Sequence, residues 1–157
     1  MGTDINEYKK IYRDETKGIT VAKITLSVDD FLNLATDWLI DCCLSGHRHN
    51  RRYYIVRGVL EEAFFRHYKN SVLFSHEPFI DPGDGIITFT GKSVCGPDDV
   101  YDPVFGKKLA LSRAEAKLHK ALAKTYTEAK VIFKTYAEAG RRMAGDELIR
   151  IHREKVS

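Results

Sequence analysis

Residues 85–114, GIITFTGKSVCGPDDVYDPVFGKKLALSRA, decide the fold because they pass from one periodicity to another. The first ten are rich in β-branched residues and predict a strand over 85–94. Cysteine, proline, glycine and aspartate then crowd residues 95–104, which is typical of a tight connection. Asp102 suits the N-cap of a helix and Pro103 suits its first turn. A strand, a short loop and a helix are therefore expected in that order.

The residues after Pro103 predict a long helix that runs from about 103 to 139 or beyond. Gly140 and Gly145 are expected to end it, and Asp146 to cap a last turn or two. A small-residue face on this helix favours close helix–helix contact and hence a homodimer. This face contains Ala110, Ala114, Ala116, Ala121, Ala123, Ala129, Ala137 and Ala139.

The upstream part of the chain predicts one strand and two helices. GITVAKITLS, residues 18–27, is typical of a strand, and an amphipathic helix follows at about 28–44, with Ser27 and Asp30 as a near capping box. A second helix is expected at 51–69, where Gly58 would allow close helix packing. Residues 4–15 indicate a frayed lead-in or short helix, and 71–75 a third strand.

These elements define the expected fold class. It is α+β and mainly helical, with a small antiparallel sheet packed on a helix pair and on one long C-terminal helix. We expect a single domain over 1–157, in which 18–84 hold the first strand and the helix pair and 85–157 hold the strand, the loop and the long basic helix.

Composition limits the class of protein. The chain has 157 residues, of which 43% are hydrophobic and 30% charged, as is ordinary for one soluble domain. It contains no apolar run of membrane-spanning length and its N-terminus is not a secretory signal. Three cysteines, an odd number, favour reduced thiols in a cytoplasm.

Charge is distributed unevenly along the chain. Residues 1–104 contain 12 Lys/Arg and 16 Asp/Glu, a net charge of −4, whereas residues 105–157 contain 13 and 6, a net charge of +7. A basic C-terminal third is compatible with nucleic acid, with an acidic protein surface or with self-association.

Two basic segments are the candidate contact surface. The first is HRHNRR, residues 47–52; the second is a stripe on one face of the long helix. Three interpretations stay open: an acidic protein partner, nucleic acid, or a solvated helix face whose charge Glu115, Glu128 and Glu138 dilute. The residues expected to bind a partner are Arg48, Arg51, Arg52, Arg113, Lys117, Lys120 and Lys124.

Other patterns point only weakly to chemistry. Cys95 at a strand end has no protease or esterase signature beside it, so a role in the core is favoured. The C-C-x3-H-x-H pattern at 42–49 lacks the usual zinc spacing, and TGKS at 90–93 lacks the first glycine of a P-loop. Turn and cap roles are favoured over cation binding for the loop aspartates, so no enzyme, cofactor or metal is expected. These aspartates are Asp81, Asp84, Asp98, Asp99 and Asp102.

The stretch 87–114 resembles an element of small accessory proteins encoded by bacteriophages and prophages. The element is a strand ending in Cys, then x-[P/E/G]-x-D-x-[F/Y]-D-x-x-x-G-x-x-x-A and a helix. The positions that match it are Cys95, Asp99, Tyr101, Asp102, Gly106 and Ala110.

This resemblance covers less than a fifth of the chain. It implies a viral, non-enzymatic protein that acts in the cytoplasm of a bacterial host. There it would inhibit a host defence or replication factor, in the manner of anti-CRISPR proteins, by occluding its surface. The implied partner is a host protein or ribonucleoprotein with an acidic or nucleic-acid-binding surface. The alternative is a phage accessory protein that binds nucleic acid through its basic C-terminal helix.

Overall fold

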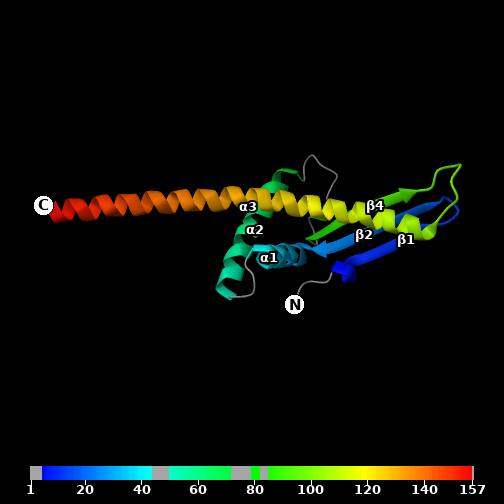
Figure 1. Cartoon of the computed structure of the whole chain (residues 1–157), viewed down its shortest axis with the longest axis horizontal. Helices are drawn as coiled ribbons and strands as arrows, with labels where there is room; N and C mark the ends of the chain where they lie inside the picture. Colours follow the sequence, from blue (N-terminus) through cyan, green and yellow to red (C-terminus); the bar gives the residue numbers. More distant parts are fainter. Residues whose placement is uncertain (1–4, 44–49, 72–78, 82–84, 157) are drawn as a thin grey trace.

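The computed structural model describes residues 5–43, 50–71, 79–81 and 85–156, and no side chains at 42, 43, 50–52, 69–71 or 79–81. Its elements follow in the order η1 (Ile5–Tyr8), β1 (Lys9–Asp14), β2 (Ile19–Ser27), α1 (Val28–Cys43), α2 (Asn50–Ser71), β3 (Phe79–Asp81), β4 (Ile86–Val94) and α3 (Pro103–Val156). Figure 1 shows the sheet and the first half of α3 side by side, with α1 and α2 next to them. The C-terminal part of α3 projects alone beyond them (Figure 1). This arrangement confirms the α+β fold class.

The sheet is antiparallel, with strand order β1-β2-β4-β3. β2 and β4 pair along their whole length, beginning with Ile19 opposite Val94. β3 pairs only with residues 86–88 of β4. Among the described strands, residues 89–94 of β4 therefore have a neighbour on one side only.

One face of the sheet is covered by α3, and Gly91 determines how closely. A Cβ atom on Gly91 would lie 2.0 Å from the carbonyl oxygen of Ala110 and 2.5 Å from the backbone nitrogen of Ala114. The helix therefore rests directly on the backbone of β4, which a glycine permits. Ala110, Ala114, Ala121 and Ala129 are buried within the chain. The predicted use of these four alanines in a homodimer is therefore wrong.

The helix pair meets the sheet in an aromatic cluster. The ring of Phe31 in α1 lies 5.2 Å from that of Phe64 in α2 and 6.4 Å from that of Phe89 in β4, between ring centres. All three side chains are buried. The hydroxyl of Tyr126 on α3 donates a hydrogen bond of 2.7 Å to the carbonyl oxygen of Ala35 on α1. α3 thus joins the sheet to the helix pair.

The two predicted upstream helices are confirmed within two residues at each end. Ser27 caps α1 as expected, since its Oγ accepts a hydrogen bond of 3.0 Å from the backbone N–H of Asp30. The prediction for Gly58 is wrong: it is exposed on α2, and a Cβ atom there would have no neighbour within 4 Å.

Two predictions about strands need correction. Residues 9–14 form the edge strand β1 rather than a helix or a lead-in, and only Ile5–Tyr8 form a helical turn. The backbone of β1 is paired with β2, and the local composition of residues 9–14 does not reveal this partner. In the predicted strand 71–75, Ser71 ends α2 and residues 72–75 lie outside the described residues.

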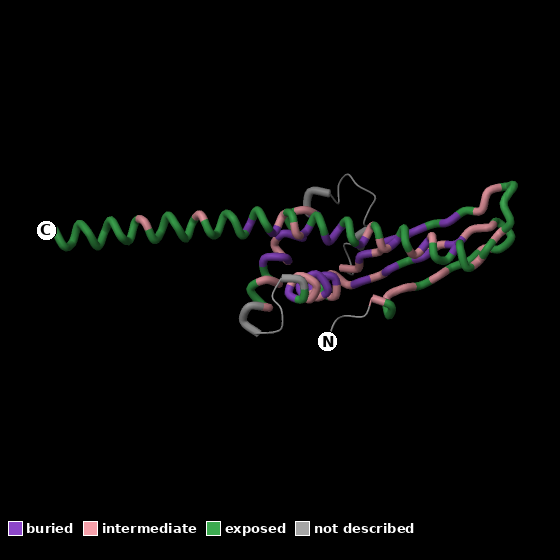
Figure 2. Tube along the Cα trace, viewed as in Figure 1, coloured by how far each residue is buried: buried purple, intermediate pink, exposed green. Residues whose placement is uncertain are grey.

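α3 does not end at Gly140 or Gly145 but continues to Val156. Ile132 is its last buried residue, and the hydroxyl of Tyr136 one turn later still donates a hydrogen bond of 2.9 Å to a carboxylate oxygen of Glu62 on α2. Residues 137–156 project away from the body (Figure 2). At a rise of about 1.5 Å per residue, this projecting segment is roughly 30 Å long. Ion pairs from Arg150 to Glu147 at 2.6 Å and to Glu154 at 2.7 Å support the helix one turn away on each side.

Candidate functional site

Two of the predicted basic residues reach from α3 to the edge of β4. The guanidinium of Arg113 donates a hydrogen bond of 2.5 Å to the carbonyl oxygen of Lys92. The ammonium group of Lys117 donates one of 2.7 Å to the carbonyl oxygen of Thr90. Because Gly91 brings the helix close, both side chains can span the distance to the strand.

The carbonyl groups that they contact point away from β2. Backbone hydrogen bonds from Val28 to Gly85 and from Cys95 to Gly18 bound the ladder between β2 and β4. Odd-numbered residues of β4 therefore turn their backbone groups toward β2, and even-numbered residues toward the opposite edge. Thr90 and Lys92 lie on that opposite edge, beyond the end of the β3 pairing. Arg113 and Lys117 thus cover an edge that would otherwise accept another strand.

A basic groove of about 430 Å³ lies between this edge and α3. Lys92 and Lys120 are exposed there, and Lys124 is exposed one turn further along the same row. The stripe predicted from spacing is therefore on one face of α3, and β4 adds a cation that spacing on the helix did not reveal. The lining of the basic groove is Gly91, Lys92, Arg113, Ala116, Lys117 and Lys120.

One of the three acidic residues expected to dilute the stripe lies elsewhere. Glu115 accepts a hydrogen bond of 2.7 Å from the ammonium group of Lys9 in β1, on the other side of β2. Glu128 lies one turn beyond Lys124 on the same row, and Glu138 lies further along α3. The described lining of the basic groove itself contains no carboxylate.

The second basic segment is not placed beside the first. Arg48 lies outside the described residues, and Arg51 and Arg52 lie in the first turn of α2, with side chains that are not described. The next turns of α2 lie against α1, where the guanidinium of Arg57 donates to Asn33 at 2.9 Å and also pairs with Asp29. A shared surface of these arginines with the stripe stays a prediction.

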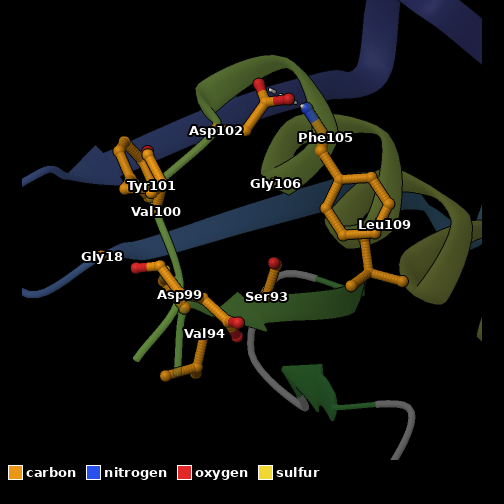
Figure 3. A pocket seen from close by; sticks show the side chains of 11 residues that line it. Gly18, Ser93, Val94, Asp99, Val100, Tyr101, Asp102, Phe105, Gly106 and Leu109 are labelled. Carbon is orange, nitrogen blue, oxygen red and sulfur yellow. Dashed lines mark hydrogen bonds between the residues drawn. The ribbon is translucent and has the colours of Figure 1, made fainter. Parts of the chain in front are cut away.

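The loop between β4 and α3 has structural roles that account for several of its residues. A carboxylate oxygen of Asp102 accepts hydrogen bonds from the backbone N–H of Val104 at 2.9 Å and of Phe105 at 3.2 Å, which confirms the predicted N-cap (Figure 3). A Cβ atom on Gly106 would lie 3.0 Å from Oγ1 of Thr20. Gly106 therefore permits a close approach between α3 and β2.

Cys95 is not a core residue, contrary to expectation. It is half-buried just after β4, and its thiol donates a hydrogen bond of 3.3 Å to the carbonyl oxygen of Asp99. The pocket beside it, of about 350 Å³, has no histidine or lysine among its described lining residues. Cys95 lies outside the core because β4 ends at Val94 and Cys95 instead bonds to Gly18 through its backbone.

The predicted acidic cluster is only partly described. Asp99 shapes the turn, with its N–H donating to the carbonyl of Gly96 at 3.2 Å. Asp81 has no described side chain, and Asp84 lies outside the described residues, as do the histidines of the 42–49 pattern. Across the side chains that are described, no three His, Cys, Asp or Glu are grouped as a metal site. No helix in the described ranges is long and apolar enough to cross a bilayer.

The chain was compared with protein-family profiles, with curated proteins and with solved structures, and none of them matched it.

Proposed function

We propose that the chain is a non-enzymatic binding protein that contacts an acidic surface of a partner protein through the basic groove. The observation that carries this proposal is the separation of charge on α3. Cations from α3 and β4 converge on one groove, while Glu115 is held by Lys9 on the far side of β2. Lys92, Lys120 and Lys124 have no acidic partner among the described residues, so their charge is available to carboxylates of another molecule.

The contact is made by side chains rather than by an added strand. Strand addition would need the outward carbonyls of Thr90 and Lys92, and both already accept hydrogen bonds from α3. A partner strand would have to displace Arg113 and Lys117 and leave their charges without those acceptors. Carboxylates placed over the groove satisfy the cations without that loss.

An acidic protein suits the groove better than single-stranded nucleic acid does. Single-strand binding combines phosphate contacts with aromatic rings on which bases stack. Among the described residues, the lining of the basic groove contains no aromatic side chain. Nucleic acid remains the second candidate, because the row from Arg113 to Lys124 spans roughly 17 Å along the helix and could follow phosphates.

The resemblance of residues 87–114 supplies the biological part of the proposal. It supports a phage-encoded inhibitor that acts in the host cytoplasm by covering a defence or replication factor. An acidic surface that normally receives nucleic acid has the charge to complement the groove.

Affinity capture from a nuclease-treated bacterial lysate tests the proposal. The variant Lys120→Glu with Lys124→Glu should lose the proteins that the natural chain captures. The control is Lys130→Glu with Lys134→Glu, which makes the same charge change at the same spacing on the same helix, about 80° away around its axis. If both variants lost the captured proteins equally, the loss would come from net charge alone, and a contact specific to the groove would be contradicted.

Titration with a DNA or RNA oligonucleotide separates the two candidates. Nucleic-acid binding through this row would weaken steeply with salt and weaken further in Lys120→Glu with Lys124→Glu. Such binding, together with capture that nuclease abolishes, would favour the second candidate over the first.

A further inference from the structure

The projecting segment of α3 presents an apolar stripe that no part of the described chain covers. Leu148 is 68% exposed and Ile151 is 37% exposed. With about 100° per residue, these two side chains share one face of the helix with three small residues that precede them. In chain order this face contains Ala137, Gly140, Ala144, Leu148 and Ile151.

Nothing within the described chain explains Gly140 in this position. A glycine inside an exposed helix costs about 1 kcal/mol relative to alanine. A Cβ atom on Gly140 would meet no atom within 4 Å, so no contact within the described chain requires the glycine. A solvated helix depends on packing for most of its stability. The small residues are therefore best explained by close approach of another helix.

The stripe is complementary to itself when reversed. In an antiparallel pair whose two-fold axis passes beside Ala144, residues equally far before and after Ala144 lie at the same height. Ala137 then lies opposite Ile151, Gly140 opposite Leu148, and Ala144 opposite its own copy. Each large side chain is matched with a small one, as close packing of two helices requires.

Charge and packing favour the antiparallel over the parallel direction. A parallel pair in register would set Gly140 against Gly140 and leave a void, and it would set Arg141 level with Arg141. The antiparallel pair opposes the helix dipoles and sets Arg141 level with Glu147.

We infer that the chain forms a symmetric dimer in which residues 137–151 of α3 pair antiparallel with the same residues of a second copy, centred on Ala144. The interface is isologous, since each chain contributes the same face. This dimer is independent of the partner proposed for the basic groove. It would place one basic groove at each end of a helical rod.

Adjacent residues on different faces provide matched variants. Leu148→Glu puts a charge into the interface and should raise the dimer dissociation constant by at least roughly 100-fold. Ile149→Glu makes the same kind of change at a side chain that is 54% exposed and lies off the stripe, and should leave the dimer intact. Sedimentation equilibrium of the full chain measures both, and circular dichroism checks that both stay helical.

Single cysteines test the register. Ala144→Cys should form an intermolecular disulfide on mild oxidation, because residue 144 meets its own copy. Ala137→Cys should not rise above the level of the unsubstituted chain, since residue 137 faces Ile151. Equal cross-linking of both variants would show a parallel pair and overturn the inference.

Two other outcomes would also overturn it. One is a chain that stays monomeric at roughly 100 μM, whether or not its helix binds a lipid vesicle or another protein. The other is a dimer that Leu148→Glu does not weaken, which would place the interface on a different surface.

Discussion

Gly91 and Ala110 are in backbone contact: a Cβ atom on Gly91 would lie 2.0 Å from the carbonyl oxygen of Ala110. This contact sets the distance between α3 and β4. It therefore also sets the reach that Arg113 and Lys117 need to cover the strand edge. The packing of the fold and the geometry of the basic groove depend on the same residue.

Gly91→Ala should lower the free energy of unfolding by about 3 kcal/mol or more, since a backbone clash cannot be relieved by a rotamer change. Urea denaturation measures this. The control is Gly58→Ala on the exposed face of α2, which should raise stability by up to about 1 kcal/mol. A Gly91→Ala chain as stable as the natural one would show that α3 does not rest on β4.

The cap of α3 gives a second prediction. Asp102→Ala should cost about 1 kcal/mol, whereas Asp102→Asn should cost much less because asparagine also caps helices. Asp98→Ala, in the same loop and exposed, should change stability by less than about 0.5 kcal/mol. Thermal unfolding of the three variants checks the order. Equal losses at positions 98 and 102 would contradict the capping role.

The basic side chains of α3 should differ in how much they contribute to stability. Arg113→Ala removes a hydrogen bond to β4 and should cost about 1 kcal/mol of stability. Lys124→Ala, on an exposed side chain, should leave stability within about 0.5 kcal/mol of the natural value. Denaturant titration distinguishes them. If Lys124→Ala lowered stability as much as Arg113→Ala, the hydrogen bond to the edge of β4 would not explain the loss in Arg113→Ala.

The dependence of stability on alkaline pH tests whether Tyr68 is buried in the core. Burial raises the pKa of Tyr68 to about 12. Below pH of about 10 both folded and unfolded chains keep this proton, and the stabilisation is complete. Between about 10 and 12 the unfolded chain loses the proton while the folded chain retains it, so stability falls by up to about 1.4 kcal/mol per pH unit. In Tyr68→Phe the free energy of unfolding should fall less steeply with pH, as denaturant titrations at several pH values across this window would measure. An identical pH dependence would place Tyr68 outside the core.

Local sequence predicted the elements whose determinants are local. The strand before Val94, the cap at Asp102 and the cap at Ser27 rest on residues within a few positions of each other. β1 was missed because an edge strand takes its hydrogen bonds from a distant partner. The continuation of α3 through Gly140 was missed because a glycine penalty of about 1 kcal/mol is small beside the rest of a long helix.

The candidate site was only half predictable. Helical spacing placed Arg113, Lys117, Lys120 and Lys124 on one face, and the structure has them there. Spacing does not say which neighbour a face meets. The contribution of Lys92 from β4 and the pairing of Glu115 with Lys9 both depend on the sheet register.

The affinity of a captured partner for the charge variants tests the central claim most directly. Calorimetric titration should show that Lys120→Glu with Lys124→Glu weakens binding by at least roughly 10-fold. Lys130→Glu with Lys134→Glu should bind nearly as the natural chain does. Equal affinity in all three chains, or equal weakening in both variants, would contradict the assignment of the basic groove as the contact surface.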